Sequence, residues 1–341
     1  MTTHEPGSVE AEIAKERTFG GKGVQVNRDI PVIDLADAAL STSDLDDALW
    51  AAAADTGFFQ VIGHGISQTD IDAAFDASSQ FFALPQEVKH RRQMPPHTNS
   101  GWEFKTQKRP STGTFDQKET YQVTISRMDE HDLWPSEEEV GGFRSTLESF
   151  EAANRALAMQ ILESFARKLG FGENFFTNRH NPASPEYQST LRILHYLPMA
   201  ATDLAPDSWR AGAHTDYDCL TLLHQRAGQR GLQVCPGADA ADLDPASPLG
   251  WTDVEPTVGT VTCNIGDMLM RWSDERLSST LHRVRMPLPE EFNNGQFDAR
   301  YSIAFFAQAN RDAVIESPSG KHAPITAADF LQQRIAANFA N

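Results

Sequence analysis

Hydrophobic and polar positions recur with two different periods along this chain of 341 residues. In the first half, apolar residues return at helical spacing. The strongest such stripe, Phe143–Leu169, predicts a long amphipathic helix that packs on a core and ends at Gly170. Weaker stripes predict helices over Ser43–Ala54 and Gln68–Phe82. The pattern therefore indicates a helical front half built around one long supporting helix.

From Leu191 onward the pattern changes to short apolar runs separated by turn residues. Several short strands at regular spacing are typical of a β-sandwich or barrel. Two strands are also expected earlier, at Ile30–Leu35 and Phe58–Ile62, and helical spacing returns at Ala327–Phe339. The strands expected in the second half are Leu191–Leu197, Leu220–His224, Gly231–Val234, Val258–Asn264, Met268–Trp272, Leu281–Met286 and Arg300–Phe306.

These patterns together predict an α+β fold that forms one cooperative unit. We expect four regions, namely a flexible N-terminal arm (1–29), a mainly helical region (30–190), a β-rich core (191–315) and a C-terminal helix packed on that core (316–341). Two stretches rich in polar residues, Gly and Pro are expected to be long loops, 90–118 and 236–248.

The composition argues against several classes of partner. A formal net charge of −18 disfavours nucleic acid and anionic membranes, because both attract clustered Lys and Arg. No apolar stretch has the length of a transmembrane helix, and residues 1–29 lack the apolar segment of a signal peptide. Three scattered cysteines do not make a disulfide framework. We therefore expect a cytoplasmic protein.

Two histidines and one aspartate are the candidate metal ligands. His214 and Asp216 lie two residues apart, so their side chains point the same way on an extended segment. His282 follows far downstream in a strand-like segment. Two imidazoles and one carboxylate form the facial triad of non-haem Fe(II) oxygenases, which leaves one face of the metal open for substrate and O2. The sequence therefore predicts an Fe(II) site.

A candidate carboxylate-binding pair lies beyond His282. Arg300 and Ser302 alternate along an expected strand, so both side chains face the same side. A guanidinium fork and a hydroxyl on one face can bind a carboxylate through charge-assisted hydrogen bonds. The chain thus offers a metal site followed by an acid-binding site.

These motifs stand in an order that resembles the isopenicillin N synthase-like branch of the Fe(II)/2-oxoglutarate-dependent dioxygenases. The resemblance extends from about residue 30 to about residue 310. It is carried by Ile30-Pro31-Val32-Ile33-Asp34-Leu35, the run from Gly57 to Ile66, Phe81-Phe82-Ala83-Leu84-Pro85, Asp116-Gln117-Lys118-Glu119, Ala213-His214-Thr215-Asp216, Leu220-Thr221-Leu222-Leu223, Gly231-Leu232-Gln233-Val234, Asn264-Ile265-Gly266-Asp267 and Leu281-His282-Arg283-Val284.

The resemblance implies a double-stranded β-helix, or jelly roll, with helices packed outside it. It implies that His214, Asp216 and His282 bind Fe(II), that Arg300 and Ser302 bind the distal carboxylate of 2-oxoglutarate, and that Tyr196 reaches the same carboxylate. It further implies hydroxylation, desaturation or ring closure of a small organic substrate through a ferryl species, with release of succinate and CO2. The cofactors are then Fe(II), 2-oxoglutarate and O2, with ascorbate as a candidate reductant.

The chain departs from the family pattern at two places near the expected pocket. Leu194 stands where the family usually has Asn, two residues before Tyr196. Asp274-Glu275-Arg276 replaces the usual Asn-Gly that follows Trp272-Ser273. Neither change removes an expected ligand of the metal or of 2-oxoglutarate.

The expected substrate contacts are less specific. Arg192 begins the strand that bears Tyr196, and related proteins often carry Arg there. Tyr217 follows Asp216, in a segment that resembles bacterial ethylene-forming enzymes. Aromatic residues expected to line an apolar cavity are Trp102, Phe104, Tyr121, Trp272 and Phe305.

Other readings of the same motifs stay open. Isopenicillin N synthase and aminocyclopropane-carboxylate oxidase share the fold and the Arg-x-Ser pair but do not use 2-oxoglutarate. An ethylene-forming enzyme is a further possibility. A jelly-roll binding protein without catalysis is the non-enzymatic alternative, against which the intact triad argues.

Overall fold

The structure is a computed structural model that describes residues 23–96, 98–106, 115–203, 209–235 and 250–339. Its larger sheet contains, from edge to edge, β2 (Val32–Asp34), β3 (Phe58–Ile62), β12 (Val261–Ile265), β9 (Leu220–Gln225), β15 (Arg300–Ala307), β6 (Thr190–Tyr196), β5 (Lys118–Val123) and β4 (Gly101–Phe104). Its smaller sheet contains β1 (Val24–Gln25), β11 (Gly250–Asp253), β10 (Leu232–Val234), β13 (His282–Val284) and β8 (Ala211–His214).

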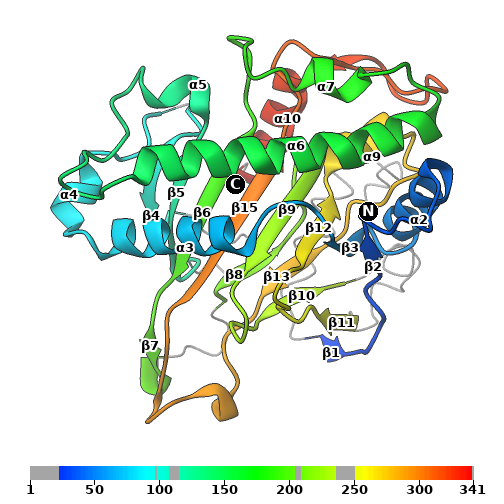
Figure 1. The fold of residues 1–341 in the computed structure, drawn as a ribbon. Coiled ribbons are helices and arrows are strands. Elements are labelled where there is room, and N and C mark those ends of the chain that lie inside the picture. The colour runs from blue at the N-terminus through cyan, green and yellow to red at the C-terminus, as the bar shows by residue number, and fades with distance from the viewer. Residues whose placement is uncertain (1–22, 97, 107–114, 204–208, 236–249, 340–341) are drawn as a thin grey trace, which may run out of the picture.

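The remaining elements surround these two sheets (Figure 1). Two short ribbons pair β7 (Met199–Ala200) with β14 (Gln296–Phe297) and β16 (Val314–Ile315) with β17 (Ile325–Thr326). Among the described residues, the α-helices are α2 (Thr42–Asp55), α3 (Gln68–Ala83), α4 (Gln86–His90), α5 (Ile125–Met128), α6 (Phe143–Leu169), α7 (Phe175–Arg179), α9 (Asp267–Trp272) and α10 (Ala327–Phe339). The same part of the chain contains 3-10 turns at Ala201–Asp203 and Pro289–Glu291.

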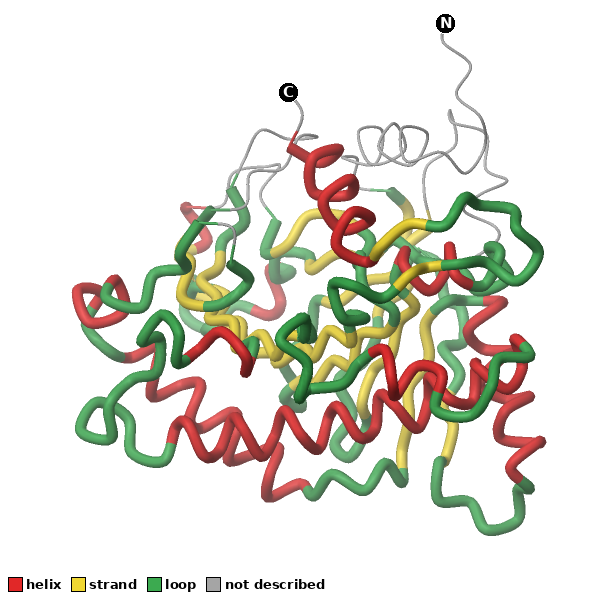
Figure 2. Tube along the Cα trace, turned by 90° about the horizontal axis from the view of Figure 1, so that it is seen from above, coloured by secondary structure: helices red, strands yellow, loops and turns green. Residues whose placement is uncertain are grey.

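The two sheets line one cavity, and helices cover the outer face of the larger sheet. Helix α6 crosses β9 and β15, while α3 contacts β6 and β15 beside it. Figure 2 shows α6 on one side of the strands and the C-terminal helix α10 on the other. This is the jelly-roll arrangement with outer helices that the resemblance implies, and the prediction is confirmed.

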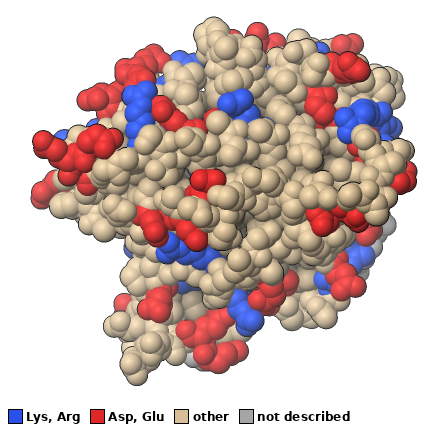
Figure 3. Space-filling view, viewed as in Figure 1, with Lys and Arg blue, Asp and Glu red and all other residues tan. Residues whose placement is uncertain are grey.

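The surface of the protein carries charges of both signs. On the face shown in Figure 3, acidic groups are spread widely, with basic groups between them. Within the described part of the chain, no helix combines the length and the hydrophobicity needed to cross a membrane.

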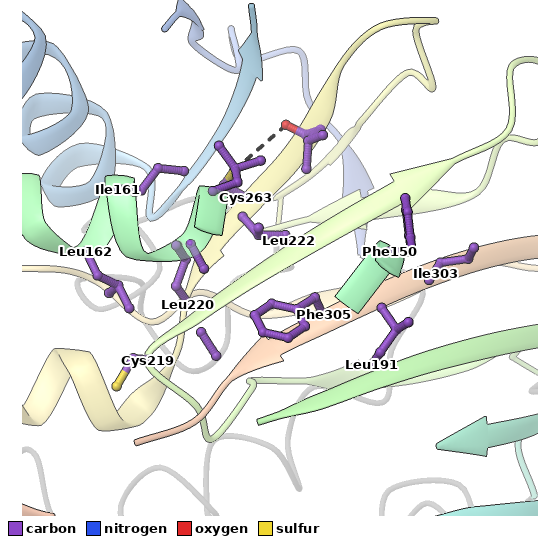
Figure 4. Close-up of a cluster of buried hydrophobic side chains, with 14 of the residues drawn as sticks. Phe150, Ile161, Leu162, Leu191, Cys219, Leu220, Leu222, Cys263, Ile303 and Phe305 are labelled. Atoms are coloured by element: carbon purple, nitrogen blue, oxygen red, sulfur yellow. Dashed lines mark hydrogen bonds between the residues drawn. The ribbon is translucent and has the colours of Figure 1, made fainter. Parts of the chain in front are cut away.

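Helix α6 forms the long core helix that its apolar stripe predicts. Phe150, Ile161 and Leu162 point from α6 towards strand residues such as Leu220 and Phe305 (Figure 4). Gly170 ends the helix in the left-handed conformation, at a φ of 78°, which costs glycine no steric strain. Burial of this stripe against the sheet fixes which face of the strands turns away from the cavity.

Three expectations about secondary structure are wrong. The segment Met268–Trp272 is not a strand but lies in helix α9, because an apolar run of five residues is too short to distinguish the two periods. The expected loop 90–118 contains β4 and the first residue of β5. Within the expected arm, Val24 and Gln25 pair with β11 as strand β1. Residues 1–22 and the loop expected at 236–248 lie outside the described residues.

A buried carboxylate joins β5 to three neighbouring elements. Glu119 accepts hydrogen bonds from Lys89 Nζ at 2.8 Å, Trp102 Nε1 at 2.8 Å and His195 Nδ1 at 2.7 Å. Burial alone would raise the pKa of Glu119, but the hydrogen bonds from His195 and Lys89 outweigh it and hold the pKa below its usual value of 4.5. The ionised form of Glu119 is therefore the one that fits the fold.

We predict that Glu119→Gln lowers the free energy of unfolding at pH 7 by about 3 kcal/mol, because it leaves Lys89 buried without its charge partner. A carboxyl group with a depressed pKa contributes stability above its unfolded pKa and loses it as the pH falls through the folded value. The variant should therefore lose less stability than the wild type between about pH 5 and pH 3.

Urea unfolding measured across this pH range tests the prediction. The matched control is Glu87→Gln, which removes an exposed carboxylate on α4. Parallel pH profiles for wild type and Glu119→Gln would show that Glu119 is not the group responsible.

Candidate metal centre and cosubstrate site

A cavity of about 1280 Å³ lies between the two sheets. Side chains that alternate along the strands line it. In the larger sheet, one face of the central strands points into the cavity and the other packs on α3 and α6. The larger sheet contributes Phe58, Lys118, Arg192, Leu194, Tyr196, Thr221, Leu223, Asn264, Arg300, Ser302, Ala304 and Phe306. The smaller sheet contributes Ala211, Ala213, His214, Leu232, His282 and Val284.

The three candidate metal ligands meet in this cavity. His214 on β8 and His282 on β13 are cross-strand partners, and their ring centroids lie 4.3 Å apart. Asp216 follows β8, and its Oδ1 lies 3.9 Å from His214 Nε2 while its Oδ2 lies 3.7 Å from His282 Nε2. One donor atom from each residue lies within 4.8 Å of the other two. The pairing of β8 with β13 thus brings together His214 and His282, which lie 68 positions apart in the sequence.

Hydrogen bonds aim the imidazoles at one point. His214 Nδ1 lies 2.7 Å from the carbonyl oxygen of Gly212, and His282 Nδ1 lies 3.2 Å from that of Thr280. Since a carbonyl oxygen only accepts, each Nδ1 carries the proton and each Nε2 keeps its lone pair. Both lone pairs are therefore available to a metal ion.

Two side chains orient the carboxylate of Asp216. Thr221 Oγ1 donates to Asp216 Oδ2 at 2.6 Å, and Asn264 Nδ2 donates to the same oxygen at 2.8 Å. Because both donors contact Oδ2, Oδ1 stays available as a single ligand atom. Such partners of ligand side chains fix ligand geometry in metal sites. Thr221 and Asn264 both belong to the family motifs, but their local sequence does not indicate this contact with Asp216.

The backbone that carries Asp216 is also held. The N–H of Asp267, at the start of α9, donates to the carbonyl oxygen of Asp216 at 2.8 Å. Gly266 precedes Asp267, and a Cβ built there would lie 2.2 Å from the carbonyl oxygen of Asp218. Only glycine allows α9 to approach the loop this closely.

The donor set fits a mononuclear Fe(II) ion. Two neutral imidazoles and one carboxylate, with their donor atoms facing one point, match the facial triad of non-haem iron enzymes. His282 and Asp216 are each 8% exposed, and His214, which also lines the cavity, is half-buried. The site can therefore hold an ion while one side stays open to other ligands.

Arg300 lies at one end of the cavity, where it is 1% exposed. Its Nη2 donates to Gln225 Oε1 at 2.8 Å, its Nε donates to the carbonyl oxygen of Gln229 at 3.0 Å and its Nη1 donates to Ser302 Oγ at 3.3 Å. Its guanidinium also lies 4.8 Å from the centroid of the Tyr196 ring. The structure therefore brings Arg300, Ser302 and Tyr196 together, as the sequence predicts.

Positive charge at this end has no acidic partner among the described residues that contact Arg300. Burial lowers the pKa of Arg300, although a guanidinium stays protonated at neutral pH. Burial and the nearby charge of Arg300 lower the pKa of Arg210 to about 10. Arg300 therefore lies with Ser302 and Tyr196 in a part of the cavity that suits a carboxylate, and the nearby Arg210 adds positive charge.

Arg192 lies in the same cavity, farther along the strands. It pairs in register with Ala304, four residues beyond Arg300 on β15, which corresponds to a separation of about 13 Å along the strand. Its Nη2 donates to Gln122 Oε1 at 2.7 Å, and its guanidinium lies 4.8 Å from the centroid of the Phe306 ring. Its Nε is buried and makes no hydrogen bond. Tyr217 also lines the cavity.

Two predicted substrate contacts are wrong. Trp272 is fully buried in the core, where its ring centroid lies 5.6 Å from that of Phe175 and 5.3 Å from that of Phe176. Phe104 is 38% exposed and borders a separate small hollow beside Trp102. An aromatic residue type gives no information on which side of a sheet or helix it occupies, so neither position could be excluded beforehand.

The remaining aromatic candidates also lie outside the cavity. Tyr121 and Phe305 are fully buried, and Phe305 faces α6 (Figure 4). Residues that sequence analysis did not single out complete the cavity wall instead. They include Asn99, Gln188, Gln308, Ala328, Leu331 and Ile335. Gln188 and Gln308 continue the alternation along the sheet, and the last three belong to one face of α10.

Comparisons with known proteins agree with this geometry. Residues 30–138 match the family described as non-haem dioxygenase in morphine synthesis, N-terminal, and residues 187–309 match the 2OG-Fe(II) oxygenase superfamily. The chain is 30% identical over 279 residues to the proline hydroxylase buaE of Petromyces alliaceus, covering 80% of this chain and 83% of that protein. It is 31% identical to the 2-oxoglutarate-dependent dioxygenase frbA of Dothideomycetidae sp., covering 76% and 79%.

A solved structure gives the same result. A full-length protein of Neurospora crassa, crystallised in complex with 2-oxoglutarate (alpha-KG) and thymine, superimposes with a TM-score of 0.77 at 29% identity, covering 92% of this chain and 99% of that one. Sequence, fold and the three facing ligand side chains therefore agree. The chain belongs to the Fe(II)- and 2-oxoglutarate-dependent oxygenase family.

Proposed function

We propose that this enzyme hydroxylates a small organic molecule that presents a carboxylate or carbonyl oxygen to Arg192. In this proposal His214, Asp216 and His282 bind Fe(II), while Arg300 binds the distal carboxylate of 2-oxoglutarate. The observation that carries the proposal is the pair of arginines at two levels of one cavity. Each guanidinium lacks an ion pair with Asp or Glu among the described residues, so each is available to an oxygen of a bound molecule.

The size of the cavity supports two molecules bound at once. A volume of about 1280 Å³ exceeds the roughly 300–1,000 Å³ of ordinary ligand pockets. One arginine end can hold 2-oxoglutarate while the other holds the substrate. Arg192 Nε supplies a buried donor without a partner, and Gln308 Oε1 supplies a buried acceptor without one. A substrate with both an acceptor oxygen and an N–H or O–H group would satisfy both.

Relatives of this chain support the substrate class. One is named a proline hydroxylase, and the Neurospora crassa protein is solved with thymine. Proline carries a carboxylate and a ring nitrogen, and thymine carries two carbonyl groups and two ring N–H groups. Both are small molecules with acceptor and donor groups, as the positions of Arg192 and Gln308 require.

The oxidising chemistry is supplied by Fe(II), 2-oxoglutarate and O2 when they are bound, with 2-oxoglutarate converted to succinate and CO2 and one oxygen atom inserted into a substrate C–H bond. The chain supplies position and environment. Thr221 and Asn264 keep Asp216 Oδ1 directed into the cavity. Leu194, Leu223 and Phe306 belong to an apolar wall that excludes water from the space beside the metal ligands. Tyr217 lines the cavity beside Asp216, which supports its proposed contact with the substrate.

The test of the proposed function begins with anaerobic titration of the Fe(II)-loaded protein with 2-oxoglutarate. Calorimetry and the visible charge-transfer absorption are the two readouts of binding. Small carboxylic acids and cyclic amides are then screened by succinate release under air. A product that gains one oxygen atom supports hydroxylation, whereas loss of two hydrogen atoms identifies desaturation or ring closure. Oxidation without succinate would contradict the use of 2-oxoglutarate by this chain.

We predict that His282→Ala abolishes Fe(II) binding and turnover, because it removes one of the three donors. The control is His90→Ala, an exposed histidine on α4 that should leave both unchanged. Anaerobic metal titration and succinate release provide the two readouts. Normal iron binding in the His282 variant would refute the assignment of the ligands.

Arg300→Leu is expected to raise the KM for 2-oxoglutarate by about 100-fold, because charge-assisted hydrogen bonds of a guanidinium contribute roughly 3 kcal/mol. Arg300→Lys keeps the charge but loses the planar fork. Its KM for 2-oxoglutarate should therefore lie between those of the wild type and of Arg300→Leu. Steady-state kinetics at saturating substrate measure the effect. A KM within error of the wild-type value would mean that Arg300 holds another group.

Arg192→Met should change the KM for the substrate and not the KM for 2-oxoglutarate. We expect the KM for the substrate to rise at least about tenfold, since a lost charged hydrogen bond costs about 1.5–3 kcal/mol, and the KM for 2-oxoglutarate to stay constant. Arg300 and Arg192 variants are thus controls for one another. If Arg192→Met raised only the KM for 2-oxoglutarate, the roles of the two arginines would be reversed.

A further inference from the structure

The C-terminal helix α10 has one face in the cavity and another against the core. Ala328, Leu331 and Ile335 recur at helical spacing and line the cavity. Ile335 is 42% exposed, so it lies on the open side of the cavity. Phe330 and Arg334, four residues apart, are each 4% exposed and point inward. One face of α10 therefore forms part of the cavity wall, and another face attaches the helix to the core.

Arg334 makes its contacts around the aspartate of the metal triad. Its guanidinium forms a buried ion pair with Asp267, which is 2% exposed. Its Nη2 lies 3.4 Å from Thr215 Oγ1, and its Cζ lies 5.4 Å from the centroid of the Tyr217 ring. Thr215 and Tyr217 flank Asp216 in sequence. One side chain of α10 thus contacts both neighbours of a metal ligand.

Asp267 completes a closed set of links. Its N–H donates to the carbonyl oxygen of Asp216, and its Oδ2 accepts from Thr215 Oγ1 at 3.1 Å. Residues 215–219 lie between the end of β8 and the start of β9, so no strand pairing holds them. The loop that presents Asp216 is therefore fixed from outside, by α9 through Asp267 and by α10 through Arg334.

A buried ion pair is an unusual choice if α10 only needs to stay attached. Removing two charges from water costs several kcal/mol per ion, and an apolar pair of similar volume packs at least as well. Phe330 and Ala327 already provide apolar burial for α10. What an arginine adds is a planar group with several donors, which can fix the relative positions of three other residues.

We propose that Arg334 is a positioning residue that joins the cavity wall formed by α10 to the loop bearing Asp216. In this arrangement, a substrate that packs on Leu331 and Ile335 also stabilises the docked position of Arg334, and thereby the geometry of the metal site. The inference rests on the proposed binding of Fe(II) by His214, Asp216 and His282. It adds that metal affinity also depends on Arg334, which is not a metal ligand and lies 118 positions from Asp216 in the sequence.

The experiment compares anaerobic Fe(II) binding, measured by calorimetry, in the wild type and in Arg334→Met. We expect the Fe(II) dissociation constant to rise by about tenfold or more, as for other partners of metal ligands. The matched control is Leu331→Ala, on the cavity face of the same helix, which should weaken substrate binding and leave Fe(II) affinity unchanged. Equal Fe(II) affinities in wild type and Arg334→Met would overturn the proposal.

Two further measurements keep the test decisive. Arg334→Met leaves Asp267 as a buried charge, so the double variant Arg334→Met, Asp267→Asn removes both charges and protects the fold. Weak Fe(II) binding that persists in the stable double variant supports positioning, and full recovery of affinity shows that the single variant only destabilised the chain. Hydrogen exchange of the α10 amides confirms that the helix is docked in the variants compared.

Failure of the inference and failure of the metal assignment give different results. If the wild type binds no Fe(II), the triad assignment is wrong. If the wild type binds Fe(II) and loses it in His282→Ala but not in Arg334→Met, the triad stands and the positioning role is refuted.

Discussion

The alternation of side chains along β15 is the constraint on which the site depends. Residues Ile303 and Phe305 pack towards α6, while Arg300 and Ser302 face the cavity. A slip of one residue in the pairing of β15 with β6 or β9 would exchange the two faces and remove both cosubstrate residues from the cavity. Burial of the apolar face under α6 therefore specifies the register that positions the chemistry.

Short-range patterns were enough to predict much of this fold and of the candidate site. The spacing of His214 and Asp216 and that of Arg300 and Ser302 reflect the period of an extended chain, so their common orientation follows from the sequence. The stripe of α6 predicts its own burial. The pairing of β13 with β8 joins residues far apart in the chain, and only the order of the family motifs indicated that His282 belongs with His214.

Other features depend on three-dimensional neighbours that no local pattern reveals. Trp272 has the same residue type as a pocket aromatic, but its position on α9 turns it towards Phe176 and the core. Thr221 and Asn264 are ordinary strand residues until β9 and β12 place both beside Asp216. Arg334 lies near the end of the chain, and nothing in its local sequence indicates an ion pair with Asp267.

The interleaving of the larger sheet affects how such a protein can change during evolution. The two segments matched by separate family descriptions, 30–138 and 187–309, are not separate modules, because β3 pairs with β12 and β5 pairs with β6. Gln122 in the first segment holds Arg192 in the second. Recombination that replaced only the first segment would therefore alter the orientation of Arg192 while leaving every residue of β6 unchanged. Selectivity is inherited across the boundary between the segments.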